Sequence, residues 1–457
     1  MGQSEKLEQP EKLEQPEKLE QPERLEQPAK VIGIIAEYNP FHGGHKFQIE
    51  EAKKRTGASW CVAAMSGDFV QRGEPAVYSK YLRARMALSC GADLVVELPS
   101  AFAVSSAEDF AACGVALLTG LGAVEVLCFG SEDGDISRIQ KAAGILAQEG
   151  GDFSSLLSLG LRSGLSWPLA RNQALLVMAD RDKDFPLKKE EMDKLLGSPN
   201  NLLGIEYCKA ILRQDSPLIP LTIRRRGQGY HDEGLEGGQA SASAIRRTLK
   251  TWELYADTDL PPYTKLTPES RTHIPPAIWH LYGQEPSLEA NDLSEILNFR
   301  LLSLRREGTD YTQYGDMSAE MARRLDSCLL QQVSWEGRIE QLKTRQYTYT
   351  RISRALLHMV LGLTAARVQS YKEAGRAPYA RILGFRKESR ELLALVKQKT
   401  AIPLITKTAD APRILTGTAL DMFSQDIYAS HIRQVLLSKK LGKPVRNEYN
   451  QPICILE

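Results

Sequence analysis

Long hydrophobic runs and clustered cysteines are missing from this sequence of 457 residues. No stretch approaches the ~20 consecutive apolar residues of a membrane-spanning helix, so we expect no association with a membrane. The seven cysteines are scattered without a Cys-x-x-Cys pair, which argues against a zinc ribbon and against a disulfide scaffold. The N-terminus is polar from its first residue, which predicts no secretory signal peptide. An odd number of apolar-flanked cysteines is typical of a reducing compartment, and we expect a cytoplasmic protein.

An excess of charge of one sign is also missing, since 58 Lys and Arg stand against 57 Asp and Glu. The balance hides an exception in residues 1–28, where four hexads of the type Glu-Lys-Leu-Glu-Gln-Pro carry eight acids and four bases. A proline in every hexad blocks a continuous helix, and one leucine per hexad buries too little surface to offset chain ordering. We therefore predict that this tail is disordered.

Short apolar runs recur about every 30 residues after the tail, and such runs are typical of strands buried on both faces. They lie at Val31–Ala36, Trp60–Met65, Asp93–Leu98, Glu125–Gly130 and Pro217–Ile223. Helix-like stretches follow the first three runs, at Gly44–Arg55, Lys80–Cys90 and Ala107–Leu118. This alternation predicts an α/β fold with a parallel sheet of five or six strands that ends near residue 250.

Beyond a proline-rich connector at residues 251–290, the apolar residues follow helical periodicity without strands. One predicted helix face consists of Leu293, Ile296, Leu297, Leu301 and Leu304, and another of Ala355, Leu356, Met359, Val360 and Leu363. We expect a first domain at residues 29–255 and a mostly helical second domain at residues 256–457. Residues 401–457 show a mixed pattern that predicts little.

The segment most informative about chemistry directly follows the first predicted strand and reads Glu-Tyr-Asn-Pro-Phe-His-Gly-Gly-His, residues 37–45. Ligands of open parallel sheets bind outside the carboxyl ends of the strands, where this loop lies. Gly43 and Gly44 allow close approach of a ligand, and the helix N-terminus offers free N–H groups to a phosphate. His42 and His45 would share one side of the first helical turn and could donate to a polyphosphate.

Two other interpretations of the loop stay open at this point. It could be a tight turn that happens to carry two surface histidines. The histidines could also be a zinc pair, although no third ligand is visible nearby. The placement of the whole segment at a strand–loop–helix junction favours nucleotide binding.

The segment Asn39 to His45 resembles the His-x-Gly-His signature of the nucleotidyltransferase superfamily. Further segments resemble the tRNA(Met) cytidine acetate ligase family within it, and together with the signature they extend the resemblance from residue 30 onward. These segments are Met65–Pro75, Asp93–Pro99, Phe129–Glu132, Ser198–Tyr207 and Gly229–His231. The resemblance implies a Rossmann-like nucleotidyltransferase domain at 29–255 that binds ATP, followed by a basic, tRNA-binding domain.

By this resemblance, the enzyme is a ligase that couples acetate to ATP and forms acetyl-adenylate. The acetyl group then passes to N4 of the wobble cytidine of elongator tRNA(Met), giving N4-acetylcytidine. The expected partners are ATP, acetate and this tRNA, with no DNA. ATP is a substrate, which we expect to bring Mg²⁺, and no tightly bound cofactor is expected. Adenylation needs no enzyme nucleophile, so the lack of a Gly-x-Ser-x-Gly motif is no gap.

The resemblance also implies site residues, with His42 and His45 as the catalytic pair. The expected ATP-binding residues are Ile35, Ala36, Glu37, Tyr38, Asn39, Pro40, Phe41, His42, Gly43, Gly44, His45, Lys46, Phe47, Gln48, Gly130, Asn200, Arg225 and Arg226. Ser243 and Arg246 resemble a second phosphate-binding motif less closely. Each position outside the loop has a plainer interpretation, namely a strand-ending turn at Gly130, an N-cap at Asn200, a solvated charge run at the arginines and an ordinary helix start around Ser243.

A basic block at residues 338–399 holds fourteen Lys and Arg against four Glu. Such a block is typical of a protein with a polyanion partner, although it is also typical of a solvated helix surface. We expect tRNA contacts from Lys343, Arg345, Arg351 and Arg354. Tyrosines 347, 349, 371 and 379 are interleaved with the bases, as stacking on unpaired bases would require, but they also suit a core.

Two other classes of function remain open. A small-molecule adenylyltransferase would use the same loop, but it would leave the second domain without a role. A non-catalytic RNA-binding protein would not need the intact histidine pair.

Overall fold

The computed structural model describes residues 30–148, 150–165, 167–181, 189–225, 242–253, 266–331, 333–344 and 346–457. The predicted disordered tail lies outside these residues and stays a prediction. Among the helices within them, none combines the length and apolar character that crossing a membrane requires.

A central sheet organises the described chain, and it is parallel except where β5 meets β8. Its strands are β1 (Val31–Ala36), β2 (Trp60–Ser66), β5 (Leu94–Leu98), β6 (Val126–Ser131), β7 (Ile219–Arg224), β8 (Ala380–Arg386), β9 (Leu404–Ile405) and β10 (Cys454–Leu456). Their order is β10-β8-β5-β2-β1-β6-β7, with β9 paired to β8. A short hairpin of β3 (Phe69–Val70) and β4 (Glu74–Pro75) lies apart from the sheet. The expected α/β class and all five strands predicted from the sequence are confirmed.

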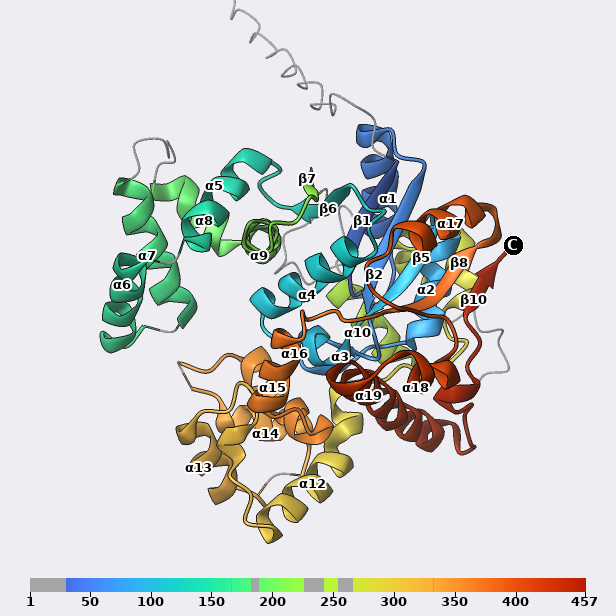
Figure 1. The fold of residues 1–457 in the computed structure, drawn as a ribbon. Coiled ribbons are helices and arrows are strands. Elements are labelled where there is room, and N and C mark those ends of the chain that lie inside the picture. Colours follow the sequence, from blue (N-terminus) through green and yellow to red (C-terminus); the bar gives the residue numbers. More distant parts are fainter. Residues whose placement is uncertain are drawn as a thin grey trace, which may run out of the picture.

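Helices connect these strands and form the rest of the molecule (Figure 1). The first group is α1 (Gly43–Thr56), α2 (Lys80–Ser89), α3 (Ser100–Ala103), α4 (Ala107–Gly120), α5 (Ile136–Ala147), α6 (Gly151–Arg162), α7 (Trp167–Arg181), α8 (Lys189–Gly197), α9 (Pro199–Arg213), α10 (Ala242–Glu253) and α11 (Pro268–His273). The second group is α12 (Ser294–Arg306), α13 (Ala319–Ser327), α14 (Trp335–Leu342), α15 (Tyr349–Leu361), α16 (Ala365–Glu373), α17 (Arg390–Lys399), α18 (Ala411–Ile414) and α19 (Gly417–Leu441). Helices α5 to α8 extend away from the sheet, and buried side chains of α5, α7 and α8 join the core that covers one of its faces.

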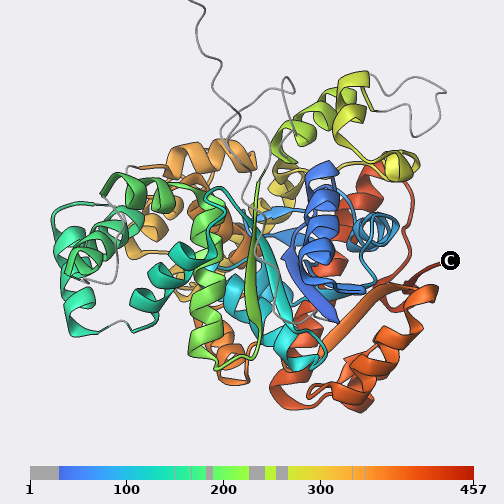
Figure 2. The same cartoon turned by 90° about the horizontal axis from the view of Figure 1, so that it is seen from above.

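Both faces of the sheet are covered, as near-continuous apolar strands require. Along β1, Ile32 and Ile34 join a core cluster formed with α1, α2 and α10, whereas Val31 and Ile35 join a cluster on the opposite face. Seen from above, helices flank the sheet on either side (Figure 2). This alternation leaves the carboxyl ends of the parallel strands as the edge where a ligand can reach the loops.

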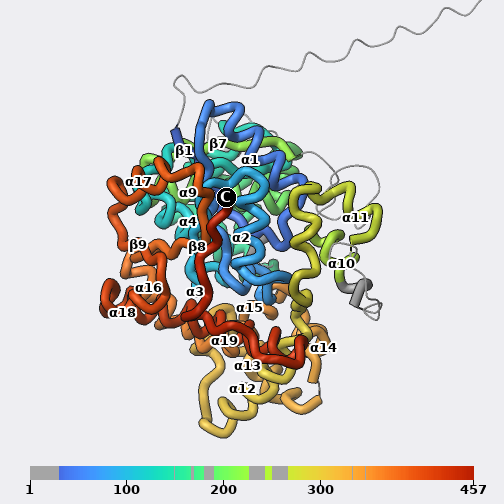
Figure 3. The backbone as a smooth tube through the Cα atoms, turned by 90° about the vertical axis from the view of Figure 1, so that its right-hand side faces the viewer, coloured from blue at the N-terminus to red at the C-terminus, as the bar shows by residue number. Residues whose placement is uncertain are grey.

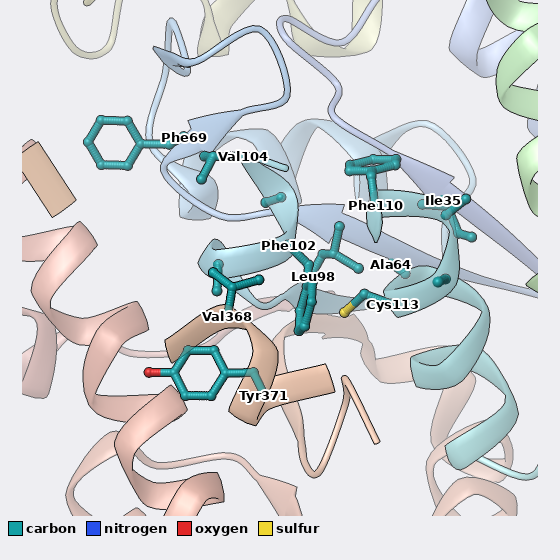
Figure 4. Close-up of a cluster of buried hydrophobic side chains, with 14 of the residues drawn as sticks. Ile35, Ala64, Phe69, Leu98, Phe102, Val104, Phe110, Cys113, Val368 and Tyr371 are labelled. Carbon is teal, nitrogen blue, oxygen red and sulfur yellow. The ribbon is translucent and has the colours of Figure 1, made fainter. Parts of the chain in front are cut away.

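The expectation that the sheet ends near residue 250 is wrong. Strands β8 and β10 come from the last 80 residues and extend the sheet beyond β5. Val368 and Tyr371 of α16 pack into the same core as Phe102 and Phe110 of α3 and α4 (Figure 4). Because partner strands can lie far apart in sequence, local periodicity did not reveal these late strands. The boundary predicted at residue 255 stays a prediction.

The helical periodicities predicted for the second part of the chain are confirmed, but the expectation of no strands there is wrong, because β8 lies at Ala380–Arg386. Leu297, Leu301 and Leu304 are buried on α12, and the predicted face of α15 is buried as well. These helices gather on one side of the sheet, below it in Figures 1 and 3.

Candidate active site

The candidate site begins where β1 ends, with His42 as the N-cap of α1. The main-chain N–H of Gly44 donates to Nδ1 of His42 (3.0 Å), and the N–H of His42 donates to Nδ1 of His45 (3.2 Å). The two imidazole rings stack with their centroids 3.8 Å apart. The prediction that both histidines share one side of the first helical turn is therefore confirmed.

The backbone hydrogen bonds fix where the imidazole protons lie. A ring nitrogen that accepts a hydrogen bond carries no hydrogen, so a neutral imidazole in that position holds its proton on the other nitrogen. Nδ1 accepts in both His42 and His45, and each ring therefore keeps an Nε2–H donor. The loop presents two adjacent neutral donors whose orientation is set before any ligand arrives.

Burial keeps these rings neutral. Desolvation, followed by the charges of Arg225, Arg246 and His273, lowers the pKa of His42 to about 3. Desolvation also lowers the pKa of His45 well below its usual value, and His42 and Arg225 add to the effect. His42 is only 5% exposed and His45 is partly buried, so the interpretation as two surface histidines is wrong. Within the described residues, no three His, Cys, Asp or Glu side chains are grouped to hold a metal.

Buried polar contacts hold the loop in place. Arg83, which is fully buried on α2, donates to the carbonyl oxygens of Glu37 (2.5 Å) and Ser66 (3.1 Å), at the ends of β1 and β2. The amide oxygen of Asn39 accepts from the N–H of Val77 (2.8 Å). These contacts fix the loop from both of its sides.

Arg246 on α10 also supports the loop. Its Nη1 donates to the carbonyl oxygen of Asn39 (2.7 Å), and its Nη2 donates to Ser243 Oγ (3.0 Å). Ser243 and Arg246, which resemble the second phosphate-binding motif less closely, therefore contact each other, and Arg246 also contacts the histidine loop.

Arg225 is the arginine that the structure brings to the histidine pair. Its main-chain N–H donates to the carbonyl of Ser131 (2.9 Å), which continues the pairing of β6 and β7. A Cβ on Gly130 would lie 3.3 Å from Cγ of Arg225, so the glycine leaves room for this side chain. Arg226, also predicted to bind ATP, lies outside the described residues.

Asn200 lies in the first turn of α9, next to Glu132, which directly follows β6. Its Nδ2 donates to Oε1 of Glu132 (2.6 Å), and Glu132 Oε2 accepts the N–H of Asn201 (3.0 Å). Helix α9 begins at Pro199 with Ser198 at the N-cap, so the interpretation of Asn200 as an N-cap is wrong.

The other residues of the predicted ATP-binding segment take different positions. Ile35 points into the core, which leaves only its backbone for a ligand (Figure 4). Tyr38 has a φ of 48°, in the left-handed region, and its buried ring packs against Phe41 and His45. Gln48 donates to the carbonyl of Cys128 at 3.4 Å, next to Phe129 and Gly130 on β6. Of the remaining predicted positions, Ala36 lies at the end of β1, Pro40 lies in the loop, and Lys46 and Phe47 lie on α1.

The basic block is less basic in space than in sequence. Several of its cations pair with acids from other parts of the chain, which a count along residues 338–399 cannot include. The partners are Asp316 for Arg354 (2.7 Å), Asp421 for Arg367 (2.5 Å), Asp109 for Lys372 (2.7 Å) and Glu448 for Arg381 (2.7 Å). The linear charge therefore overstates the charge presented to solvent.

The predicted tRNA contacts are distributed unevenly. Arg351 lies over the ring of Tyr347 at 5.2 Å and donates to the carbonyl of Asp316, while Arg354 is mostly buried beside the same aspartate. The side chain of Lys343 is 49% exposed and forms an ion pair with Glu340 (3.4 Å). Arg345 lies outside the described residues.

The expectation that the tyrosines stack on bases fails for three of the four. Tyr347, Tyr371 and Tyr379 are buried in the core. Tyr349 is half-buried and shares a hydrogen bond with Glu74.

Sequence reasoning missed three residues of the site, Arg83, Glu132 and His273. A Cβ on Gly43 would lie 3.1 Å from the carbonyl oxygen of His273, so residues 230 positions apart meet at the loop. Glu132 lies in the segment Phe129–Glu132, which resembles the ligase family, but nothing in the sequence pairs it with Asn200. Arg83 gave no signal, because a single arginine in a helix is usually exposed.

Comparisons with known proteins show the family of this chain. The family model for HIGH nucleotidyl transferases matches residues 29–447. The tRNA(Met) cytidine acetate ligase of Acetivibrio thermocellus is 36% identical over 434 residues, covering 93% of this chain and 100% of the relative. The enzyme of the same name from Caldanaerobacter subterraneus subsp. tengcongensis is 36% identical over 417 residues, covering 90% of this chain and 97% of the relative.

Two crystal structures of Thermotoga maritima TmcAL resemble the fold closely, each at 28% identity over 93% of this chain and 99% of that chain. One is bound with alpha-thio ATP and has a TM-score of 0.81, and the other is an apo form with a TM-score of 0.83. These matches confirm the resemblance found in the sequence. The chain belongs to the tRNA(Met) cytidine acetate ligase family of HIGH nucleotidyl transferases, and it is a ligase.

Proposed function

We propose that this ligase activates acetate with ATP and acetylates N4 of the wobble cytidine of elongator tRNA(Met), giving N4-acetylcytidine. The observation that carries the proposal is the stacked pair of neutral histidines at the end of β1, with Arg225 and Gly130 beside them. The names of the relatives supply the substrates, and the ATP analogue bound to a relative supports ATP as the cosubstrate.

In the first step, an acetate oxygen attacks the α-phosphorus of ATP, and pyrophosphate leaves with the electrons of the broken P–O bond. Negative charge then builds on the departing phosphates. The Nε2–H groups of His42 and His45 donate to these oxygens, and Arg225 adds a positive charge beside them. Neutral donors suit this task because they are already oriented and need no proton from solvent. Mg²⁺, if it accompanies ATP, would be held largely by phosphate oxygens and water.

In the second step, the amine of the cytidine attacks the acetyl carbonyl of acetyl-adenylate. The N–C bond forms, the bond to the AMP oxygen breaks, and AMP leaves. The histidines have no pyrophosphate to hold at this stage, so we expect them to contribute mainly to the first step. The predicted second domain, with Lys343 exposed on it, is the part proposed to bind the tRNA.

The test incubates the protein with ATP, isotope-labelled acetate and tRNA(Met). Pyrophosphate release is followed with and without tRNA, and the tRNA is digested and weighed by mass spectrometry. We expect labelled N4-acetylcytidine at the wobble position. AMP transferred to a small acceptor would favour an adenylyltransferase, whereas RNA binding with no pyrophosphate release would favour a non-catalytic role.

A further inference from the structure

A cavity of about 180 Å³, lined by both polar and apolar side chains, lies beside the histidine loop, between α10 and α14. Figure 3 shows these two helices one above the other on the same side of the molecule. The described residues that line the cavity include Glu74, Ser243, Arg246, Arg247, Glu289 and Glu336. This volume far exceeds the ~10–15 Å³ that a cavity needs to hold one water molecule, so it has room for a larger group.

The cavity communicates with the reaction centre through Arg246. This side chain lines the cavity and donates to the carbonyl of Asn39 in the histidine loop (2.7 Å). Its charge also lies close enough to act on His42. A ring bound in the cavity would therefore lie next to the loop that is proposed to act in the activation of acetate by ATP.

Glu74 also lines the cavity, and the hairpin β3–β4 fixes its position. On one side of the hairpin tip, the N–H of Gln71 donates to Oε1 of Glu37 in the histidine loop (2.7 Å). On the other side, Ser353 Oγ of α15 donates to the carbonyl of Gly73 (2.9 Å). Gly73 has a φ of 79°, and a Cβ there would lie 2.4 Å from the N of Arg354, so this approach requires glycine. The hairpin thus ties the histidine loop to the helices that are proposed to bind tRNA.

The lining suits the Watson–Crick edge of cytosine. That edge presents one amine donor, N4, and two acceptors, N3 and O2. A carboxylate accepts from N4 of cytosine, and arginine side chains donate to ring acceptors. Unpaired RNA bases are commonly flipped out and recognised along this edge. Uracil would place its O4 acceptor against the carboxylate and would be rejected.

We propose that this cavity receives the cytosine of the acceptor tRNA and that Glu74 is the base of the transfer step, an inference that rests on the proposed function. As N4 attacks the acetyl carbonyl, the new N–C bond forms and AMP leaves with the electrons of the C–O bond. The N4 proton passes to the Glu74 carboxylate. Arg246, which also lines the cavity, orients the ring while it supports the histidine loop.

The test separates the two half-reactions. Adenylation is followed by acetate-dependent exchange of labelled pyrophosphate into ATP, and transfer by single-turnover acetylation of tRNA from synthetic acetyl-adenylate. Glu74→Gln should lower the transfer rate about 10²-fold or more and leave exchange within about twofold of the wild type. Glu74→Asp should restore part of the transfer. The wild type should bind an anticodon stem-loop with C at the wobble position more tightly than one with U, and Glu74→Gln should lose this preference.

A control variant accompanies it. Glu391→Gln changes an exposed acid on α17 and should leave both half-reactions unchanged. Undiminished transfer by Glu74→Gln overturns the proposal, as does an equal loss in both half-reactions of the folded variant. A rise in the KM for acetate during exchange would also overturn it, because the cavity would then hold acetate. A wild type that makes no N4-acetylcytidine would instead refute the proposed function.

Discussion

Two groups of buried ionisable residues lie at the carboxyl edge of the sheet, and they avoid the cost of burial in opposite ways. At the end of β1, His42 and His45 give up their charge and keep a donor free. At the end of β5, burial raises the pKa of Glu97 to about 7, and ion pairs with Lys80 at 2.8 Å and Arg381 at 3.1 Å favour its charged form against that cost. All three of these ion-paired side chains are at most 4% exposed.

This difference suits the histidine pair to catalysis and the ion-paired group to stabilising the fold. The neutral pair can meet the negative charge of a phosphate without first breaking an existing ion pair. In the second group the ion pairs are already satisfied internally, since Arg381 also binds Glu448 (2.7 Å) near the C-terminus. It holds β8 and the chain end against β5. We therefore expect changes in the first group to affect catalysis, and changes in the second to affect stability.

The largest effect should come from breaking the ion-paired group with Arg381→Met. This change leaves the carboxylates of Glu97 and Glu448 buried with less compensation, which typically costs about 3–5 kcal/mol. The matched control is Arg386→Met on the same strand, where the arginine pairs with Glu388 at the surface. That change should cost less than about 1 kcal/mol. Urea unfolding of both variants measures the difference, and equal losses would mean that the group does not fasten the strand.

The histidine pair should show the converse pattern. His42→Asn or His45→Asn removes one oriented donor and should slow adenylation by about 10²–10³-fold, or 3–4 kcal/mol. Transfer from synthetic acetyl-adenylate should stay within roughly tenfold of the wild type, because pyrophosphate has already left. His280→Asn, at an exposed position, is the control. Equal loss in both steps would mean that the histidines organise the whole site.

Lowering the pH should reduce the free energy of unfolding through the buried, neutral His42. His42 has a folded pKa of about 3 against an ordinary value of 6.5, so between these values the unfolded chain binds the proton and the folded chain does not. Stability is therefore complete above pH 6.5 and falls as the pH drops toward 3, by about 2 kcal/mol at pH 5 from this residue. His42→Gln cannot titrate and should lose less stability between pH 7 and pH 5. An unchanged pH dependence in urea unfolding would contradict the neutral-histidine interpretation.

The sequence predicted a region well where the residues that determine its structure are close together in the chain. The loop at residues 37–45 could be predicted because a strand, a turn and a helix start lie in one continuous segment. Partners such as His273 and Glu132 could not, because they reach the site only through the fold. Ion pairs between distant residues also made the charge of residues 338–399 look larger than it is at the surface, since Arg354 and Arg367 are paired with Asp316 and Asp421. The same cause hid β8 and β10, which pair with strands far away in sequence.

The basic block allows a smaller test of what its charges do. Lys343→Glu changes an exposed cation, so it should weaken tRNA binding and reduce the slope of log affinity against log salt by about one. Arg354→Glu would place a second acid beside Asp316, so it should mainly lower stability. Filter binding at several salt concentrations, together with thermal melts, separates the two results. A salt slope unchanged by Lys343→Glu would remove this lysine from the interface.

The smallest effect should come from deleting residues 1–28. The hexads combine a proline every six residues with a single leucine, so they cannot form a helix long enough to pack. Ordered contacts are already in place at Lys30, whose N–H donates to Glu125 (2.8 Å) and whose carbonyl accepts from Trp60 (3.2 Å). Deletion preserves both contacts, so stability should change by less than about 0.5 kcal/mol, the range typical of surface changes. Adenylation and transfer should match those of the full chain. A clear drop in melting temperature would show that the tail packs against the body of the protein, and a drop in tRNA affinity alone would assign the tail to that interface.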